Sequence, residues 1–143
     1  MEAGREAVEA ALRVLRGRDL SRRELDRRLA ERGFAEEERG AALETLERTG
    51  LVDDARFAEA RARALAGRGA GDALVRHELA RAGVPADMLE QALAALEPEE
   101  ERVRRIVARR GASVRTARYL LGKGFADDVV GRVVAGEGDA ELA

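Results

Sequence analysis

The segment SRRELDRRLAERGF, residues 21–34, carries the start and stop signals of one complete α-helix. Ser21 and Glu24 match a capping box, in which the serine hydroxyl accepts the amide of the third helical residue and the glutamate reaches back to the cap. The leucines that follow lie on one face at helical spacing, and Gly33 can adopt the left-handed conformation that ends helices. We therefore predict a helix over residues 21–32.

The unit that contains this helix occurs three times along the chain. An offset of 50 residues, and then a further offset of 41, aligns apolar residues with apolar residues and glycine with glycine. The aligned sets include Leu15, Leu65 and Ile106; Leu29, Leu79 and Leu120; and Gly33, Gly83 and Gly124. The interval from the first set to the glycines is 18 residues in every copy. This constancy predicts that the three copies share one local structure.

Helical periodicity and end signals together predict nine helices and no sheet. The expected ranges are 3–16, 21–32, 36–48, 53–66, 71–82, 86–96, 99–110, 113–123 and 127–135. We predict an all-α fold of three tandem three-helix repeats, stacked into an elongated, curved molecule because one repeat buries little apolar surface alone. The repeats are assigned to residues 1–48, 49–97 and 98–135, followed by a flexible acidic tail at 136–143.

The composition agrees with a helical protein and disfavours several kinds of site. Aromatic residues make up only 3% of the 143 residues and charged residues 38%, which is typical of helices rather than sheets. The chain has no cysteine and one histidine, which excludes disulfides and disfavours zinc. No run approaches the ~20 apolar residues of a membrane span, and the acidic N-terminus does not match a signal peptide. We expect a cytoplasmic protein without membrane association.

Catalytic residues are not recognisable in the sequence. A nucleophile needs a nearby base, and the one imidazole, His77, falls on the exposed face of its predicted helix. The glycines Gly67, Gly69 and Gly71 lack the preceding strand and the spacing of a phosphate-binding loop, so we interpret them as a flexible connector. The three glutamates at 36–38 fit the first turn of a helix, where acids are favoured, better than a metal site. We predict no enzymatic activity, no metal and no cofactor.

Charge is distributed unevenly along the chain. Residues 84–101 carry six acids and no base, whereas residues 102–132 carry nine bases and two acids, a net charge of +7. Such an excess repels itself unless an anion neutralises it, so we predict a basic face that contacts an anionic partner. The apolar stripe of the helix at 99–110 leaves Arg102 on a flank of that face, and we assign Tyr119 to the core rather than to base stacking. The predicted binding residues are Arg102, Arg104, Arg105, Arg109, Arg110, Arg115, Arg118, Lys123 and Arg132.

Three stretches, in this order, resemble the RecX family and cover nearly the whole chain. They are ALRVLRGRDLSRRELDRRLAERGF at 11–34, GLVDDARFAEARARALAGRGAGDALVRHELARAGV at 50–84 and ARYLLGKGF at 117–125. The middle stretch is the most specific, with its Asp-Asp-x-Arg-Phe-Ala run, its Gly-x-Gly connector and its helix with Glu-Leu followed by Gly-Val. Ala70 departs from the family pattern, since an aromatic residue is usual between these two glycines.

The resemblance implies the same three-helix repeats and a regulatory, non-enzymatic role in homologous recombination, DNA repair and the SOS response. Members of the family bind the filament that the RecA recombinase forms on single-stranded DNA, lodge in its helical groove, and restrain its growth, ATP hydrolysis and strand exchange. The implied partner is the RecA filament. The basic face could then meet the acidic wall of the groove or contact single-stranded DNA directly, and we expect the chain to be a monomer.

Two other functions are compatible with the residue pattern. The first is a helix-turn-helix DNA-binding transcriptional regulator, which places basic residues at the start of a recognition helix and dimerises to fix half-site spacing. Here the copies recur at unequal intervals, and no dimerisation segment is apparent. The second is a helical scaffold that binds only proteins. The net charge of −2 slightly favours the scaffold, while the basic block counts against it.

Overall fold

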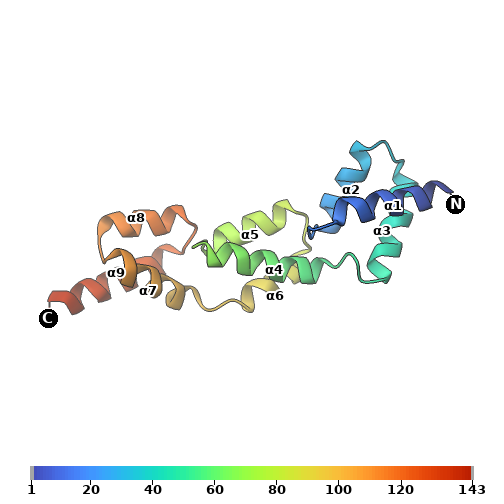
Figure 1. Cartoon of the computed structure of the whole chain (residues 1–143). Helices are drawn as coiled ribbons and strands as arrows, with labels where there is room; N and C mark the ends of the chain where they lie inside the picture. Colours follow the sequence, from blue (N-terminus) through green and yellow to red (C-terminus); the bar gives the residue numbers. More distant parts are fainter. Residues whose placement is uncertain (1, 143) are drawn as a thin grey trace.

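The computed structural model describes the backbone of residues 2–142 and the side chains of residues 4–137. The described residues form nine α-helices and no strand, which confirms the predicted all-α fold (Figure 1). The helices are α1 (Glu2–Leu15), α2 (Arg22–Glu31), α3 (Glu36–Arg48), α4 (Asp54–Gly67), α5 (Asp72–Arg81), α6 (Ala86–Ala94), α7 (Glu99–Arg110), α8 (Val114–Gly122) and α9 (Asp127–Leu142). None of these helices is both long and apolar enough to cross a lipid bilayer.

Helix α9 is longer than the sequence predicted. The expected helix ended at residue 135, because the glycines that follow disfavour helix and acids without periodicity suggest a tail. The helix instead continues to Leu142, since Gly136 keeps a right-handed backbone and no proline follows it. The tail predicted at 136–143 is therefore helical as far as Leu142, and residue 143 lies outside the described residues. All other helix ends lie within two residues of the predicted positions.

The predicted end signals form where expected. The Ser21 hydroxyl accepts the Glu24 amide at 3.1 Å, and the Glu24 carboxylate accepts the Ser21 amide at 3.1 Å, which completes the capping box. Asp53 and Ser113 cap α4 and α8 in the same way, through the amides three residues further on. Left-handed glycines follow the second helix of each group, with φ of +90° at Gly33, +85° at Gly83 and +91° at Gly124.

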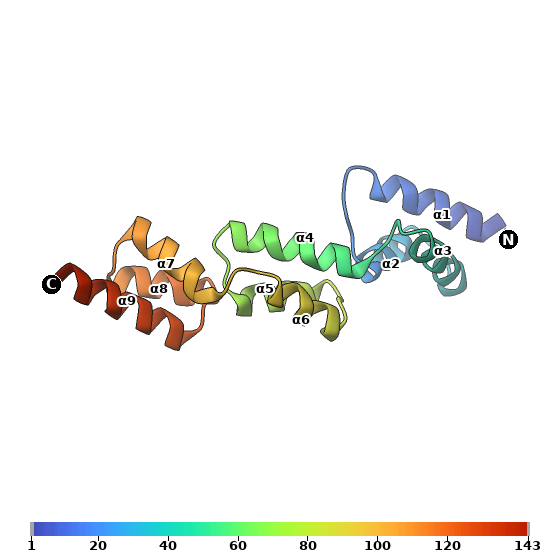
Figure 2. The ribbon, with the colours of Figure 1, turned by 90° about the horizontal axis from the view of Figure 1, so that it is seen from below.

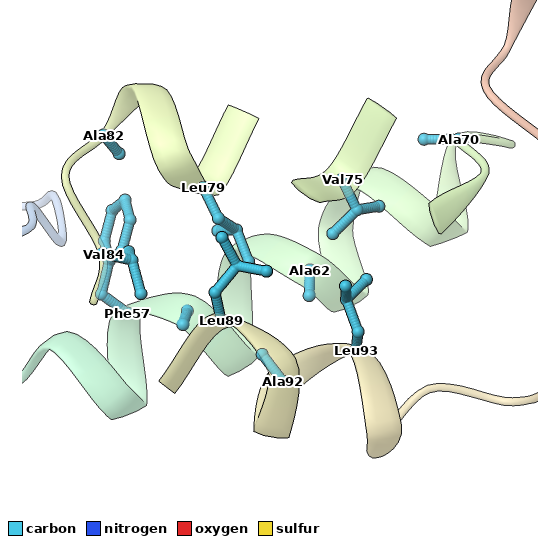
Figure 3. Close-up of a cluster of buried hydrophobic side chains, with 11 residues drawn as sticks. Phe57, Ala62, Ala70, Val75, Leu79, Ala82, Val84, Leu89, Ala92 and Leu93 are labelled. Atoms are coloured by element: carbon cyan, nitrogen blue, oxygen red, sulfur yellow. The ribbon is translucent and has the colours of Figure 1, made fainter. Parts of the chain in front are cut away.

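Each group of three helices has its own hydrophobic core. The aligned leucines Leu29, Leu79 and Leu120 are fully buried, one in each core, which confirms the predicted equivalence. Val52 packs in the first core, so the first group extends beyond α3. Figure 3 shows the middle core, where Leu79 of α5 and Leu89 of α6 point toward one another and the ring of Phe57 lies beside Val84.

The three groups follow one another in a row, with the two termini at opposite ends in both views (Figures 1 and 2). The molecule is elongated, as predicted, but the reason differs from the predicted one. We expected the repeats to stack because they share apolar surface, whereas each hydrophobic core is confined to one group. Neighbouring groups are instead joined by turns, hydrogen bonds and ion pairs.

Leu79→Ala should lower the free energy of unfolding by about 2–5 kcal/mol, because it removes a fully buried side chain and leaves a cavity. Leu121→Ala is the matched control, since Leu121 is 41% exposed on the equivalent helix of the last group. Chemical denaturation followed by circular dichroism measures both changes. Equal effects of the two substitutions would contradict the packing described here.

Candidate functional site

The middle and last groups meet where the N-terminus of α5 rests on the turn between α8 and α9. The Gly71 amide donates to the Lys123 carbonyl at 2.8 Å, and the Ala73 amide donates to the Gly124 carbonyl at 3.2 Å. A Cβ atom at Gly71 would overlap the carbonyl group of Gly124. The glycine is therefore required by a close approach between two backbones. This corrects the interpretation of Gly71 as part of a flexible connector.

Glu99, in the first turn of α7, ties the same two segments together. One carboxylate oxygen accepts the Asp72 amide at 2.6 Å, and the other accepts the Ala126 amide at 3.0 Å. One side chain therefore satisfies amides at the starts of both α5 and α9, which have no partner inside their own helices. Glu99 is thus both an acid in the first turn of α7 and a link between the middle and last groups.

Arg102 lies inside this junction rather than on an exposed basic face. Its guanidinium donates to the Asp72 carboxylate at 2.6 Å and to the Ala70 carbonyl, and its side chain is only 7% exposed. It also lies over the Phe125 ring, 5.4 Å from the ring centre. Arg102 therefore does not lie on the exposed basic face where the sequence placed it, because Asp72, 30 positions earlier in the sequence, pairs with it inside the junction.

Three further predicted binding residues are paired with acids of the preceding segment. These pairs are Arg104 with Glu100 at 3.4 Å and Glu101 at 3.5 Å, Arg105 with Glu97 at 2.7 Å, and Arg132 with Glu100 at 3.1 Å. The hydrogen bond that the Arg105 guanidinium donates to the Glu97 carboxylate raises the pKa of Arg105 above its ordinary value. Self-repulsion among residues 102–132 is therefore smaller than the sequence suggested, because Glu97, Glu100 and Glu101 pair with bases of this block.

Five predicted binding residues have no ion pair among the residues that the structure describes. They are Arg109, Arg110, Arg115, Arg118 and Lys123. Lys123 is half-buried beside the connector between α4 and α5, and the four arginines are exposed. The sequence therefore identified the region that carries uncompensated charge but did not separate its free arginines from its paired ones.

The exposed bases at the end of α7 line a groove shared with the middle group. This basic groove has a volume of about 290 Å³ and is lined by Arg68, Gly69, Ile106, Arg109, Arg110 and Tyr119. The Arg110 guanidinium lies 3.7 Å from the centre of the Tyr119 ring, which fixes its position by a cation–π contact. Tyr119 also packs against the last core, as predicted.

Arg68 is the groove residue that sequence reasoning missed. It is a single base outside the charged block, at the C-terminal cap of α4, and it lies in the segment that we interpreted as a flexible connector. Arg68 is followed by Gly69, which has a φ of +90°, and a Cβ drawn on Gly69 would lie 3.8 Å from the Tyr119 hydroxyl of the last group. The charge pattern of the sequence does not indicate that Arg68 lies near Arg109 and Arg110, because this proximity depends on how the middle and last groups meet.

Known proteins resemble this chain over nearly its whole length. A family model described as RecX, second three-helix domain, matches residues 53–93, which comprise most of α4 to α6. The regulatory protein RecX of Halorhodospira halophila is 36% identical over 151 aligned positions, which cover 97% of this chain and 94% of that protein. The chain belongs to the RecX family. The RecX of Trichlorobacter lovleyi is 35% identical and covers 85% of this chain and 88% of its own.

Solved structures agree with this RecX assignment at the level of the fold. The crystal structure of RecX from Lactobacillus salivarius has a TM-score of 0.81 at 20% identity, over 96% of this chain and 97% of that one. A second crystal structure of a regulatory protein RecX has a TM-score of 0.77 at 21% identity, over 92% of this chain and 71% of that one. The three-helix groups are therefore arranged in much the same way in these RecX chains.

Arg102→Ala should lower the free energy of unfolding by about 3 kcal/mol, the lower end of the range for a broken buried ion pair, because Asp72 keeps some contact with water. Arg104→Ala removes an exposed arginine from the same helix and should cost no more than about 0.5 kcal/mol. Denaturant titrations of the two variants measure the difference. Stability losses of similar size would show that Arg102 does not hold the junction.

Proposed function

We propose that the chain binds the RecA filament on single-stranded DNA and restrains its growth, ATP hydrolysis and strand exchange, without hydrolysing nucleotide itself. The observation that carries this proposal is the match to regulatory RecX proteins over almost the entire length of both chains. An elongated row of three groups also suits a ligand that is itself long and repetitive (Figure 1).

We place the contact with the filament or its DNA at the basic groove. Arg68, Arg109 and Arg110 have no acidic partner among the described residues, so binding an anion breaks no existing ion pair. A guanidinium offers paired N–H donors that match phosphate and carboxylate oxygens. Arg104, Arg105 and Arg132 are less suitable, because each would first have to leave a carboxylate.

Addition of the purified chain should lower the single-strand-dependent ATP hydrolysis of its cognate RecA, because restrained filaments carry fewer active subunits. Steady-state hydrolysis over a series of molar ratios measures the effect, and the chain alone should release no phosphate. An unchanged rate at several-fold molar excess would contradict the proposed function. Tight binding to a specific duplex in place of the filament would favour the helix-turn-helix regulator.

Replacing Arg109 and Arg110 together with Glu should weaken filament binding and make the slope of log K against log salt shallower by about 1.4, since each lost phosphate contact contributes about 0.7 on single strands. The matched control replaces Arg5 and Arg63, exposed bases outside the groove, with Glu and therefore makes the same change in net charge. Fluorescence anisotropy across a salt titration measures both variants. Identical slopes would place the contact on another face, even if ATP hydrolysis is still inhibited.

A further inference from the structure

The contact between the first and middle groups, the first junction, contains a pocket that the proposed function does not use. This junction pocket has a volume of about 250 Å³ and lies where α2 meets α4 and α5. The residues that line it are Glu24, Arg27, Arg61, Glu78, Arg81 and Ala82. Ala82 also holds the junction itself, because its carbonyl accepts the Ser21 hydroxyl at 2.5 Å. The pocket therefore depends on how the first and middle groups meet.

Three arginines from three helices line the junction pocket without an acidic partner. Arg27 belongs to α2, Arg61 to α4 and Arg81 to α5. None of them forms an ion pair within the part of the chain that the structure describes. Arg61 is half-buried, and its guanidinium lies 5.0 Å from the centre of the Phe57 ring, which holds it in place by a cation–π contact. The pocket thus offers guanidinium N–H donors that no carboxylate of the described chain occupies.

Two glutamates limit the negative charge that the junction pocket can accept. The Glu24 carboxylate already accepts the Ser21 amide at 3.1 Å, while Glu78 is half-buried and has no ion pair with a described residue. Three bases and two acids leave the pocket a formal charge of +1, whereas the basic groove carries three bases and no acid. A strand of phosphates would bring several negative charges close to these glutamates. A single carboxylate therefore suits the junction pocket better than a nucleic-acid backbone does.

A mainly apolar hollow shares Arg61 with the junction pocket. It has a volume of about 140 Å³ and is lined by Asp19, Phe57, Ala60, Arg61 and Ala64. Its one acid, Asp19, lies 3.8 Å from the Arg56 guanidinium. Protein interfaces combine apolar and polar surface and are enriched in arginine, whereas a phosphate backbone has no apolar group to fill such a hollow. The hollow therefore favours a protein as the occupant of this surface.

We propose that the junction pocket binds an aspartate or glutamate side chain on the surface of a protein partner, and that apolar residues next to this acid fill the hollow beside Arg61. The three guanidiniums donate to the oxygens of the partner's carboxylate, and Glu78 accepts from an amide or a base beside it. The inference rests on the proposed function, in which this partner is the protein part of the filament. The junction pocket then contacts protein, and the basic groove contacts phosphate.

Replacing Arg27 and Arg81 together with Glu should weaken binding to RecA filaments on single-stranded DNA by about tenfold or more, because two donors to the partner's carboxylate are lost. The same variant should bind naked single-stranded DNA as tightly as the control. The matched control replaces Arg28 and Arg63 with Glu, since these exposed bases belong to the same two groups and line neither the pocket nor the hollow. Fluorescence anisotropy measures both ligands, and circular dichroism establishes that both variants keep the helical content of the parent.

Three results would count against this inference, and each is distinct. Filament binding equal to that of the control, with ATP hydrolysis still inhibited by the parent, would overturn the inference and leave the proposed function intact. Equal losses on the filament and on naked DNA would identify the pocket as a phosphate site and would overturn it as well. A parent chain that binds no filament would contradict the proposed function and the inference together.

A carbodiimide tests the chemistry of the occupant, because it joins an amine to a carboxylic acid as an amide, takes up the water released and leaves phosphodiesters unchanged. Lys123 is the only lysine of the chain, so Arg81→Lys combined with Lys123→Arg places the one side-chain amine in the junction pocket. Arg28→Lys combined with Lys123→Arg is the control. Mass spectrometry of the cross-linked filament should find an amide to an acid of the recombinase with the first variant only. An amide to Glu24 or Glu78 in its place would show that the pocket's own acids occupy its arginines, and would overturn the inference.

Discussion

The rest of the structure depends on one kind of contact. The start of the second helix of one group packs against the turn that follows the second helix of the next group. Each group of helices buries its own apolar residues, so the cores fix the groups but do not fix how the groups are placed. Placement comes from Ser21 on Ala82 and from Gly71 on Lys123. Each contact pairs a backbone carbonyl at the end of a second helix, which that helix leaves unpaired, with the Ser21 hydroxyl at the first junction and the Gly71 amide at the second. The row in Figure 1 is their consequence.

The same contact decides which arginines are available to a partner. Bringing α5 onto the turn after α8 places Asp72 beside Arg102, which becomes a buried structural residue. It also brings Arg68 to Arg109 and Arg110, and this produces a groove that neither group could form alone. This junction thus buries Arg102 and brings Arg68, Arg109 and Arg110 together at the surface. The way in which the middle and last groups meet therefore determines which arginines can bind a partner.

Much of the fold could be predicted from the sequence, because helix ends and apolar spacing are local signals. The capping box at Ser21 and the left-handed Gly33 are examples, and both form as expected. The site was less predictable, because the partner of Arg102 lies 30 positions away and Gly71 is explained by a backbone from another group. Charge counted over a window of sequence cannot distinguish a paired arginine from a free one. The extension of α9 was missed because glycine propensity is a weak signal against continuation of a formed helix.

Amide hydrogen exchange in dilute solution measures whether the junctions between the groups form as described. The first amides of a helix normally exchange quickly, because they have no partner inside the helix. At the start of α5 the Asp72 and Ala73 amides donate to Glu99 and to the Gly124 carbonyl, whereas α8 begins at the open end of the row. We expect protection of Asp72 and Ala73 close to that of the middle core, and fast exchange at Val114 and Arg115. Equally fast exchange at the starts of both helices would contradict this expectation.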